Sequence, residues 1–307
     1  MKIATMATGG IGGFLAVKLI GAGHQVATIA RGAHLAAIRD NGLRLDGPDG
    51  VETARPWIAT DDPAEVGPVD AILFGVKGDA LAAAAEACRP LIGPQTLVVP
   101  FQNGVEGPDR LAAILPPENV VTGIARVSTT ISAPGVIRQT GSFATFVFAE
   151  RDSLPSARIE ALQKALREAG VAAPVSPDIE EELWRKFVLF SAFSGVTAAA
   201  RCTAKDIAEH PRLAALCRDV MGETALLGRR RGVALAEGLE DTLLQTIITM
   251  PAQTRASTAI DLEHGRPLEI EWISGAVARL AAESGVPAPL NAALYAMLLP
   301  YRDGAAG

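Results

Sequence analysis

Cysteine and histidine are scarce in this sequence, and the few that occur form no metal-binding or disulfide pattern. The three cysteines, Cys88, Cys202 and Cys217, are odd in number and widely spaced. They are therefore expected to be small buried hydrophobic residues in a reducing compartment. The four histidines are scattered, and none belongs to an HExxH or similar ligand motif. We expect no catalytic metal.

The chain also lacks an excess of positive charge and any apolar run long enough to cross a membrane. Its formal net charge is −6, so it has no general attraction to nucleic acids or anionic lipids. The longest apolar run, 187–200, contains serine, glycine and threonine and is shorter than a membrane span. Glycines interrupt the N-terminal apolar segment before a signal peptide could form. These features predict a cytoplasmic protein that binds neither nucleic acid nor membrane.

Hydrophobic residues are abundant, and their pattern changes once along the chain. They make up 49% of the 307 residues, which supports full-sized cores, and a chain of this length suits two domains. Strand-like and helix-like segments alternate at first, which predicts a parallel sheet covered by helices. From residue 179 onward helical periodicity predominates. The predicted fold is α/β, with a Rossmann dinucleotide-binding domain over residues 1–175 and an all-α domain over residues 176–307.

The first domain contains short elements at regular intervals and two exceptions to the alternation. Strands are expected at 2–6, 25–30, 69–76, 96–101 and 120–126, and a short apolar piece at 171–175. Helices are expected at 11–22, 34–41, 79–88 and 155–169. The exceptions are a hairpin within 43–58 and β-rich pieces over 127–149, joined by Ala133-Pro134-Gly135 and by Thr140-Gly141-Ser142.

A glycine-rich turn lies between the first predicted strand and the first predicted helix. Its residues are Ala7, Thr8, Gly9, Gly10, Ile11 and Gly12. Unpaired backbone N–H groups and the helix dipole favour a pyrophosphate at such a helix start, and glycines let it come close. Gly9 and Gly12 occupy the second and third glycine positions of the GxGxxG pattern, and Ala7 replaces the first. The strand–turn–helix context predicts dinucleotide binding.

Three further residues follow predicted strands at the edge where ligands bind in open parallel sheets. Arg31 stands where an NAD enzyme usually has an acidic residue, and a guanidinium can pair with a 2′-phosphate. This indicates NADP(H) rather than NAD(H), unless Arg31 is only a solvated surface residue. Lys77 is expected to face the cofactor, and Asn103 is placed likewise, although an Asn-Gly pair can be simply a turn.

Several segments together resemble the ketopantoate reductases (2-dehydropantoate 2-reductases). They are the glycine-rich turn, Ile29–Gly32, Gln102–Gly104, Glu182–Lys186 and Glu269–Gly275, in the family's order and spacing. The resemblance extends from Met1 to about Leu299. It implies a Rossmann domain followed by a helical domain, with the active site between them. It also implies NADPH-dependent reduction of a small 2-keto acid, most closely 2-dehydropantoate to pantoate in pantothenate biosynthesis. A homodimer is expected by analogy.

The resemblance also implies a role for individual residues. Lys186 matches the lysine that protonates or polarises the keto oxygen, and Glu269 matches the carboxylate that binds the substrate hydroxyl. Asn103 matches the residue that orients substrate and cofactor. Ser257 matches the serine that contacts the substrate carboxylate, and Lys77 a lysine that contacts the cofactor.

The sequence departs from the family pattern after the catalytic lysine. The family usually has asparagines four and eight residues later and then a proline, whereas this chain has Phe190, Ser194 and Gly195. Phe190 and Ser194 are therefore expected to line a substrate pocket that is more apolar or tighter. Two alternatives remain open: another two-domain hydroxy-acid dehydrogenase with a different substrate, and a non-catalytic NADP(H)-binding sensor.

Overall fold

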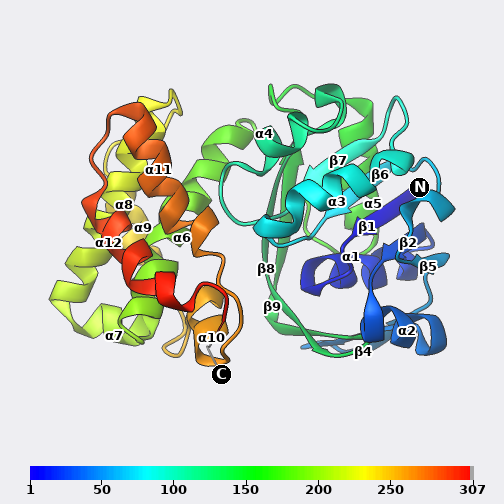
Figure 1. Ribbon diagram of the computed structural model, residues 1–307, viewed down its shortest axis with the longest axis horizontal. Coiled ribbons are helices and arrows are strands. Elements are labelled where there is room, and N and C mark those ends of the chain that lie inside the picture. The colour runs from blue at the N-terminus through cyan, green and yellow to red at the C-terminus, as the bar shows by residue number, and fades with distance from the viewer. Residues whose placement is uncertain (305–307) are drawn as a thin grey trace. The chain divides into compact units, whose positions relative to one another are not determined.

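The computed structural model describes residues 1–304 and divides the chain into two compact units (Figure 1). The first unit consists of Met1–Gln102 and Glu106–Ile179, and the second of Asn103–Val105 and Glu180–Gly307. Sheets occur only in the first of these units among the described residues, so the predicted fold class, α/β followed by all-α, is confirmed. The short segment 103–105 belongs to the helical unit although the chain on either side of it belongs to the first unit.

A parallel five-stranded sheet forms the centre of the first unit. Its strand order is β5-β2-β1-β6-β7. The bounds are β1 Lys2–Met6, β2 Gln25–Ile29, β5 Ile58–Thr60, β6 Ala71–Phe74 and β7 Leu97–Pro100. The order of the strands reverses at β1, and ligands bind beside the carboxyl ends of strands at such a reversal. The predicted glycine-rich turn lies directly after β1.

Helices cover both faces of this sheet, because successive strand residues point to opposite faces. Ile3 packs in a cluster with α1 and α5, whereas Ala4 packs in a cluster with α3. The helices are α1 Gly10–Gly21, α2 Gly32–Asn41, α3 Leu81–Ala87, α4 Gly107–Ala112 and α5 Ala157–Glu168. The 3₁₀ turns are η1 Pro63–Glu65, η2 Gly78–Ala80, η3 Arg89–Leu91 and η4 Pro117–Asn119. The predicted helices agree with these elements to within a few residues.

A second sheet in the same unit differs from the prediction. Its order is β4-β3-β9-β8, with β3 Leu43–Gly47, β4 Gly50–Ala54, β8 Thr122–Ala133 and β9 Val136–Ala149. The predicted hairpin within 43–58 is confirmed as β3 and β4. The strand expected at 120–126 does not extend the parallel sheet: only Val120 bridges to it, and β8 pairs antiparallel with β9. An apolar run does not reveal its partner, because that choice depends on contacts distant in sequence.

One smaller expectation in this region also requires correction. Thr140-Gly141-Ser142 does not separate two strands but lies within β9, where the pairing with β8 shifts register and Gly141 has a φ of +73°. The piece 171–175 forms only an isolated bridge, between Ala172 and Thr145. The second sheet packs on the first through aromatic rings, since the Phe146 ring lies 5.1 Å from that of Phe101.

The second unit is built from helices around a large apolar core and a smaller apolar cluster. The helices are α6 Ile179–Ala199, α7 Ala204–Glu209, α8 Pro211–Arg230, α9 Leu239–Ile248, α10 Ser257–Glu263, α11 Ser274–Ser284 and α12 Pro289–Leu298. Two 3₁₀ turns complete the unit, η5 Ile270–Trp272 and η6 Leu299–Tyr301. The apolar run 187–200 lies in α6 and just beyond it, where Phe187, Val188 and Val196 are buried in the core. Among residues 1–304, no helix has the length and apolar character needed to cross a bilayer.

The three cysteines are buried free thiols, as expected from the sequence. Burial raises the pKa of Cys88 and of Cys217 to about 12, and it also raises the pKa of Cys202. Because the thiolate is the reactive form, these thiols are both shielded and protonated near neutral pH.

We therefore predict that no thiol of the native protein reacts with Ellman's reagent at pH 8 on the time scale of free cysteine. All three should react after unfolding in guanidinium chloride, which serves as the control. One equivalent released rapidly from the native protein would contradict the burial of these side chains.

Candidate functional site

The glycine-rich turn is held in place from within the first unit. Thr8 is buried, its N–H donates to the Ile29 carbonyl at 2.8 Å, and its hydroxyl lies 2.9 Å from the Thr5 hydroxyl. A Cβ on Gly10 would lie 2.6 Å from the Thr129 carbonyl oxygen, and one on Gly12 would collide with the Ala7 carbonyl. Both positions therefore require glycine. No positive φ occurs at Ala7, which explains why alanine is accepted at the first position of the pattern.

The helix start that follows this turn suits a pyrophosphate. Gly9 is the N-cap of α1, and neither a side-chain cap nor an acidic residue in the first turn competes for the N–H groups there. A Cβ on Gly9 would have open space around it, so a phosphate can approach the backbone closely. The first N–H groups of a helix lack partners within the helix, and the helix dipole adds positive potential. The residues present therefore fit the dinucleotide that the sequence predicts.

Arg31 and Lys77 lie at the carboxyl ends of the two strands that flank β1. Arg31 follows β2 as the N-cap of α2, and Lys77 follows β6 as the N-cap of η2. Both side chains are exposed. Among the residues that the structure describes, Arg31 forms no ion pair with a carboxylate, so its guanidinium can receive a phosphate. Both residues are thus on the edge of the sheet where the sequence placed them.

Lys186, Asn103 and Glu269 form one hydrogen-bonded cluster in the second unit. The Lys186 ammonium on α6 donates to Asn103 Oδ1 at 3.1 Å, and Asn103 Nδ2 donates to Glu269 Oε2 at 3.5 Å. All three side chains are half-buried. The Lys186 ammonium requires an acceptor and the Glu269 carboxylate requires a donor. Together they fix the amide with its oxygen toward Lys186 and its nitrogen toward Glu269. The structure thereby brings together three residues that are 83 and 166 positions apart.

A glycine places Asn103 beside η5, the 3₁₀ turn that directly follows Glu269. Gly104 has a φ of +93°, and a Cβ there would lie 2.6 Å from the Trp272 carbonyl oxygen. The Asn-Gly pair thus forms a turn, and this turn brings segment 103–105 against η5 within the helical unit.

Glu271, the second carboxylate of the segment Glu269–Gly275, has a structural role. Glu271 accepts a hydrogen bond from the Tyr295 hydroxyl at 2.6 Å. The same tyrosine ring would lie 2.9 Å from a Cβ on Gly275, so the glycine of this segment is required for packing. Glu269 and Glu271 are therefore distinguished by their partners: Glu269 belongs to the lysine cluster, and Glu271 fixes η5 against α12.

Phe190 lies one helical turn after Lys186 and contacts it. The Lys186 ammonium is 5.3 Å from the centroid of the Phe190 ring, within the range of a cation–π interaction. A more apolar pocket was predicted here but not this contact, although the spacing of four residues on a helix could have indicated it. The ammonium is therefore bordered by an aromatic face and by the Asn103 amide.

Ser194 and Ser257 differ in exposure. Ser194 is buried and its hydroxyl lies 2.6 Å from that of Thr258, which is also buried. Ser257 is exposed at the first position of α10. Thr258 was not predicted as a site residue, and nothing in the sequence distinguished it. Gly195 follows Ser194 where the family usually has a proline. A Cβ on Gly195 would lie 2.8 Å from Leu294 Cδ1, so α6 approaches α12 closely there.

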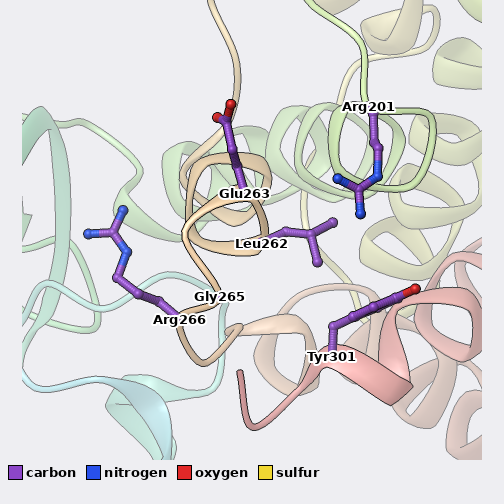
Figure 2. A pocket seen from close by; sticks show the side chains of 6 residues that line it. All are labelled: Arg201, Leu262, Glu263, Gly265, Arg266 and Tyr301. Carbon is purple, nitrogen blue, oxygen red and sulfur yellow. The ribbon is translucent and has the colours of Figure 1, made fainter. Parts of the chain in front are cut away.

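A pocket of about 250 Å³ occurs elsewhere in the second unit. It is lined by Arg201, Leu262, Glu263, Gly265, Arg266 and Tyr301 (Figure 2). Figure 2 shows the side chain of Arg266 extending away from those of Arg201 and Tyr301. None of the predicted site residues lines this pocket, and the lysine cluster is separate from it. Within residues 1–304, no three His, Cys, Asp or Glu side chains gather in a way that could hold a metal ion.

Comparisons with known proteins agree over almost all of the chain. The family model described as ketopantoate reductase PanE/ApbA matches residues 3–153, and its C-terminal counterpart matches residues 178–302. A 2-dehydropantoate 2-reductase of Mesorhizobium japonicum is 33% identical, covering 97% of this chain and 97% of its own length. A crystal structure of a PanE/ApbA family ketopantoate reductase from Ralstonia eutropha JMP134 is 31% identical, covers 98% of both chains and has a TM-score of 0.89.

The same fold also occurs with other substrates. A D-mandelate dehydrogenase structure with NADH and anilino(oxo)acetate has a TM-score of 0.87 at 21% identity and covers 98% of both chains. That likeness concerns the fold alone. The matches over both units confirm the resemblance drawn from the sequence motifs and the enzyme class, an NADP-dependent oxidoreductase acting on CH–OH groups. The chain belongs to the ketopantoate reductase family, whose members reduce a keto acid with NADPH.

Proposed function

We propose that this protein reduces 2-dehydropantoate, or a relative with a more apolar side chain, to the 2-hydroxy acid. The observation that carries the proposal is the hydrogen-bonded series from Lys186 through Asn103 to Glu269. The ammonium is held by a neutral amide, and the amide in turn donates to a carboxylate. This arrangement suits a reaction in which a carbonyl oxygen gains negative charge and then a proton.

NADPH, when bound, supplies the hydride that adds to the keto carbon. Lys186 donates a hydrogen bond to the keto oxygen, stabilises the developing alkoxide and delivers the proton that completes the alcohol. Asn103 Oδ1 holds the ammonium in place, so that little reorganisation is needed during the reaction. Glu269 accepts from Asn103 Nδ2, which keeps the amide oxygen turned toward Lys186, and its carboxylate is the group proposed to bind a substrate hydroxyl.

The cofactor residues proposed are those of the glycine-rich turn, with Arg31, Lys77 and Asn103. The turn binds the pyrophosphate through backbone N–H groups, and Arg31 pairs with the 2′-phosphate. Residues 1–175 are proposed as the NADP(H)-binding domain and 176–307 as the catalytic domain, to which the segment 103–105 contributes. The homodimer, the cytoplasmic location and the lack of nucleic-acid binding stay predictions.

Substrate binding is assigned to Ser257, Ser194 and Phe190 together with Asn103. Ser257 is exposed and can bind the substrate carboxylate. The Ser194 hydroxyl is already paired with Thr258, so it contributes through that pair rather than by reaching the substrate alone. Phe190 places an aromatic face beside the reacting ammonium, which supports a substrate with an apolar side chain.

Replacement of Lys186 tests the proposed chemistry. Lys186→Ala removes the proton donor and should lower kcat for every accepted 2-keto acid by about 100-fold or more. Lys205→Ala, at an exposed lysine of the same unit that pairs with Glu209 at 3.7 Å, is the matched control and should keep full activity. The measurement is NADPH oxidation at 340 nm across a keto-acid panel. If Lys186→Ala stays within about threefold of the wild type, the proposed mechanism is wrong.

Replacement of Arg31 tests how the cofactor is selected. Arg31→Asp exchanges a charge-assisted bond to the 2′-phosphate for repulsion, so kcat/KM for NADPH should fall on the order of 100-fold. The value for NADH should change little, because NADH lacks that phosphate. Arg39→Asp, at an arginine within α2 that instead binds the Ala59 carbonyl, is the control. Equal efficiency of the wild type with NADH and NADPH would contradict the role given to Arg31.

The substrate is tested with 2-keto acids graded by side-chain size and hydroxylation. Phe190→Asn restores the family's usual residue, so it should raise kcat/KM for 2-dehydropantoate relative to the analogue in which hydrogen replaces the hydroxyl. A change in that ratio of about tenfold is expected from one added hydrogen bond. An unchanged ratio would show that Phe190 does not contact the substrate side chain. The hydroxy acids that correspond to these keto acids, assayed in the oxidative direction, test the alternative of another hydroxy-acid dehydrogenase.

A further inference from the structure

His34 on α2 connects the glycine-rich turn to the second sheet. Its Nε2 lies 2.8 Å from the Thr8 carbonyl oxygen, and the Gly135 N–H donates to its Nδ1 at 2.9 Å. Gly135 lies in the turn between β8 and β9, has a φ of +74° and would bring a Cβ to 3.0 Å from the Ala37 Cβ. The imidazole is half-buried between these two backbone groups, and all of its contacts are within the first unit.

The two partners determine the protonation state of this ring. A backbone N–H can only donate, so Nδ1 must carry a lone pair, and a carbonyl oxygen can only accept, so Nε2 must carry the proton. His34 is therefore the neutral Nε2–H tautomer. A protonated ring would direct an Nδ1–H at the Gly135 N–H and lose that bond.

The bond to Thr8 orients the next peptide group of the turn. The carbonyl of Thr8 and the N–H of Gly9 belong to one planar trans peptide, so they point in opposite directions. Fixing the carbonyl toward His34 therefore aims the Gly9 N–H away from the ring. Gly9 is the N-cap of α1, with open space where its Cβ would be, and this is where the pyrophosphate of the cofactor is proposed to bind.

We propose that His34 is a positioning residue for the cofactor: its neutral ring holds the Thr8–Gly9 peptide in the orientation that binds the pyrophosphate. This inference rests on the proposed role of the glycine-rich turn. It gives the β8–β9 turn a part in cofactor affinity, because Gly135 holds the ring that holds Thr8.

The surroundings of His34 favour the neutral ring. Burial lowers its pKa from 6.5, and the Thr8 carbonyl opposes this only in part. Charged residues on the elements around the ring include Arg31 at the N-cap of α2, Arg39 and Asp40 on α2, Arg44 on β3 and Arg138 on β9. None of them is among the causes of the shift, and the glycine-rich turn itself has no charged residue. The ring is thus neutral at physiological pH and becomes protonated only as the pH falls below 6.5.

Two amide substitutions separate the two bonds of the ring. The side-chain amide of His34→Gln reaches the position of Nε2 and can donate to Thr8, whereas that of His34→Asn stays near Nδ1 and can only accept from Gly135. NADPH affinity and KM should stay within about twofold of the wild type in His34→Gln and weaken about tenfold in His34→Asn. In both variants, kcat and the KM for the keto acid should stay within about twofold. His24→Gln is the control, since His24 instead contacts the N-terminal amine at 3.3 Å.

The pH dependence gives a readout that a merely structural role would not move. The NADP⁺ affinity of the wild type, measured by calorimetry, should fall relative to that of His34→Gln as the pH drops below 6.5. A protonated Nδ1–H would face the Gly135 N–H and push the ring away from Thr8, whereas the glutamine amide gains no proton. Titration of the cofactor phosphates is common to both proteins and cancels in the ratio.

The outcomes distinguish this inference from the proposed function. Asparagine and glutamine variants that both bind NADP⁺ like the wild type, or a wild type that binds more tightly than His34→Gln at low pH, would overturn the positioning role. Loss of affinity in His34→Asn should be equal for NADP⁺ and NAD⁺, since both carry the pyrophosphate, whereas a loss limited to NADP⁺ would also overturn it. Failure of the wild type to bind NADP⁺ at all would instead overturn the cofactor site itself.

Discussion

The hydrogen bond between the Lys186 ammonium and the Asn103 amide is the contact on which the functional assignment depends. A lysine on a helix beside several glutamates is ordinarily a solvated surface charge. Here its ammonium is bounded by an amide oxygen at 3.1 Å and by the Phe190 ring at 5.3 Å. The Asn103 oxygen is turned toward this ammonium because the Asn103 amide nitrogen donates to Glu269. Removal of Asn103 would break the hydrogen-bonded connection between the lysine and the carboxylate.

That contact requires a segment of the chain to leave the unit in which its neighbours lie. Residues 103–105 follow the last strand of the parallel sheet, yet they pack with the helical unit. Gly104 makes this possible, because a residue with a Cβ could adopt neither its φ of +93° nor its approach to the Trp272 carbonyl without strain. The same principle governs the cofactor turn, where Gly10 and Gly12 lie against backbone oxygens. In both places close backbone packing, rather than flexibility, explains the glycine.

The departures from the family pattern along α6 are related to one another. Phe190 adds an apolar face beside the lysine, Ser194 turns inward to Thr258, and Gly195 lets α12 approach. The polar groups that the family usually presents here are replaced by packing and by internal pairing. This combination keeps Lys186 while it alters what lies beside it, which is the basis for proposing a different substrate rather than a different reaction.

The sequence by itself determined the fold class and the glycine-rich turn, because these depend on local periodicity and on a motif with fixed spacing. The roles proposed for Lys186 and Glu269 came from the resemblance to the family's motifs. The sequence could not determine the partner of the strand at 120–126, since an apolar run fits either a parallel or an antiparallel neighbour. Nor could it reveal that Thr258 pairs with Ser194, or that His34 bridges Thr8 and Gly135, 101 residues further along the chain. Such contacts join residues that are distant in sequence, and only the tertiary structure, which decides which backbone groups meet, could establish them.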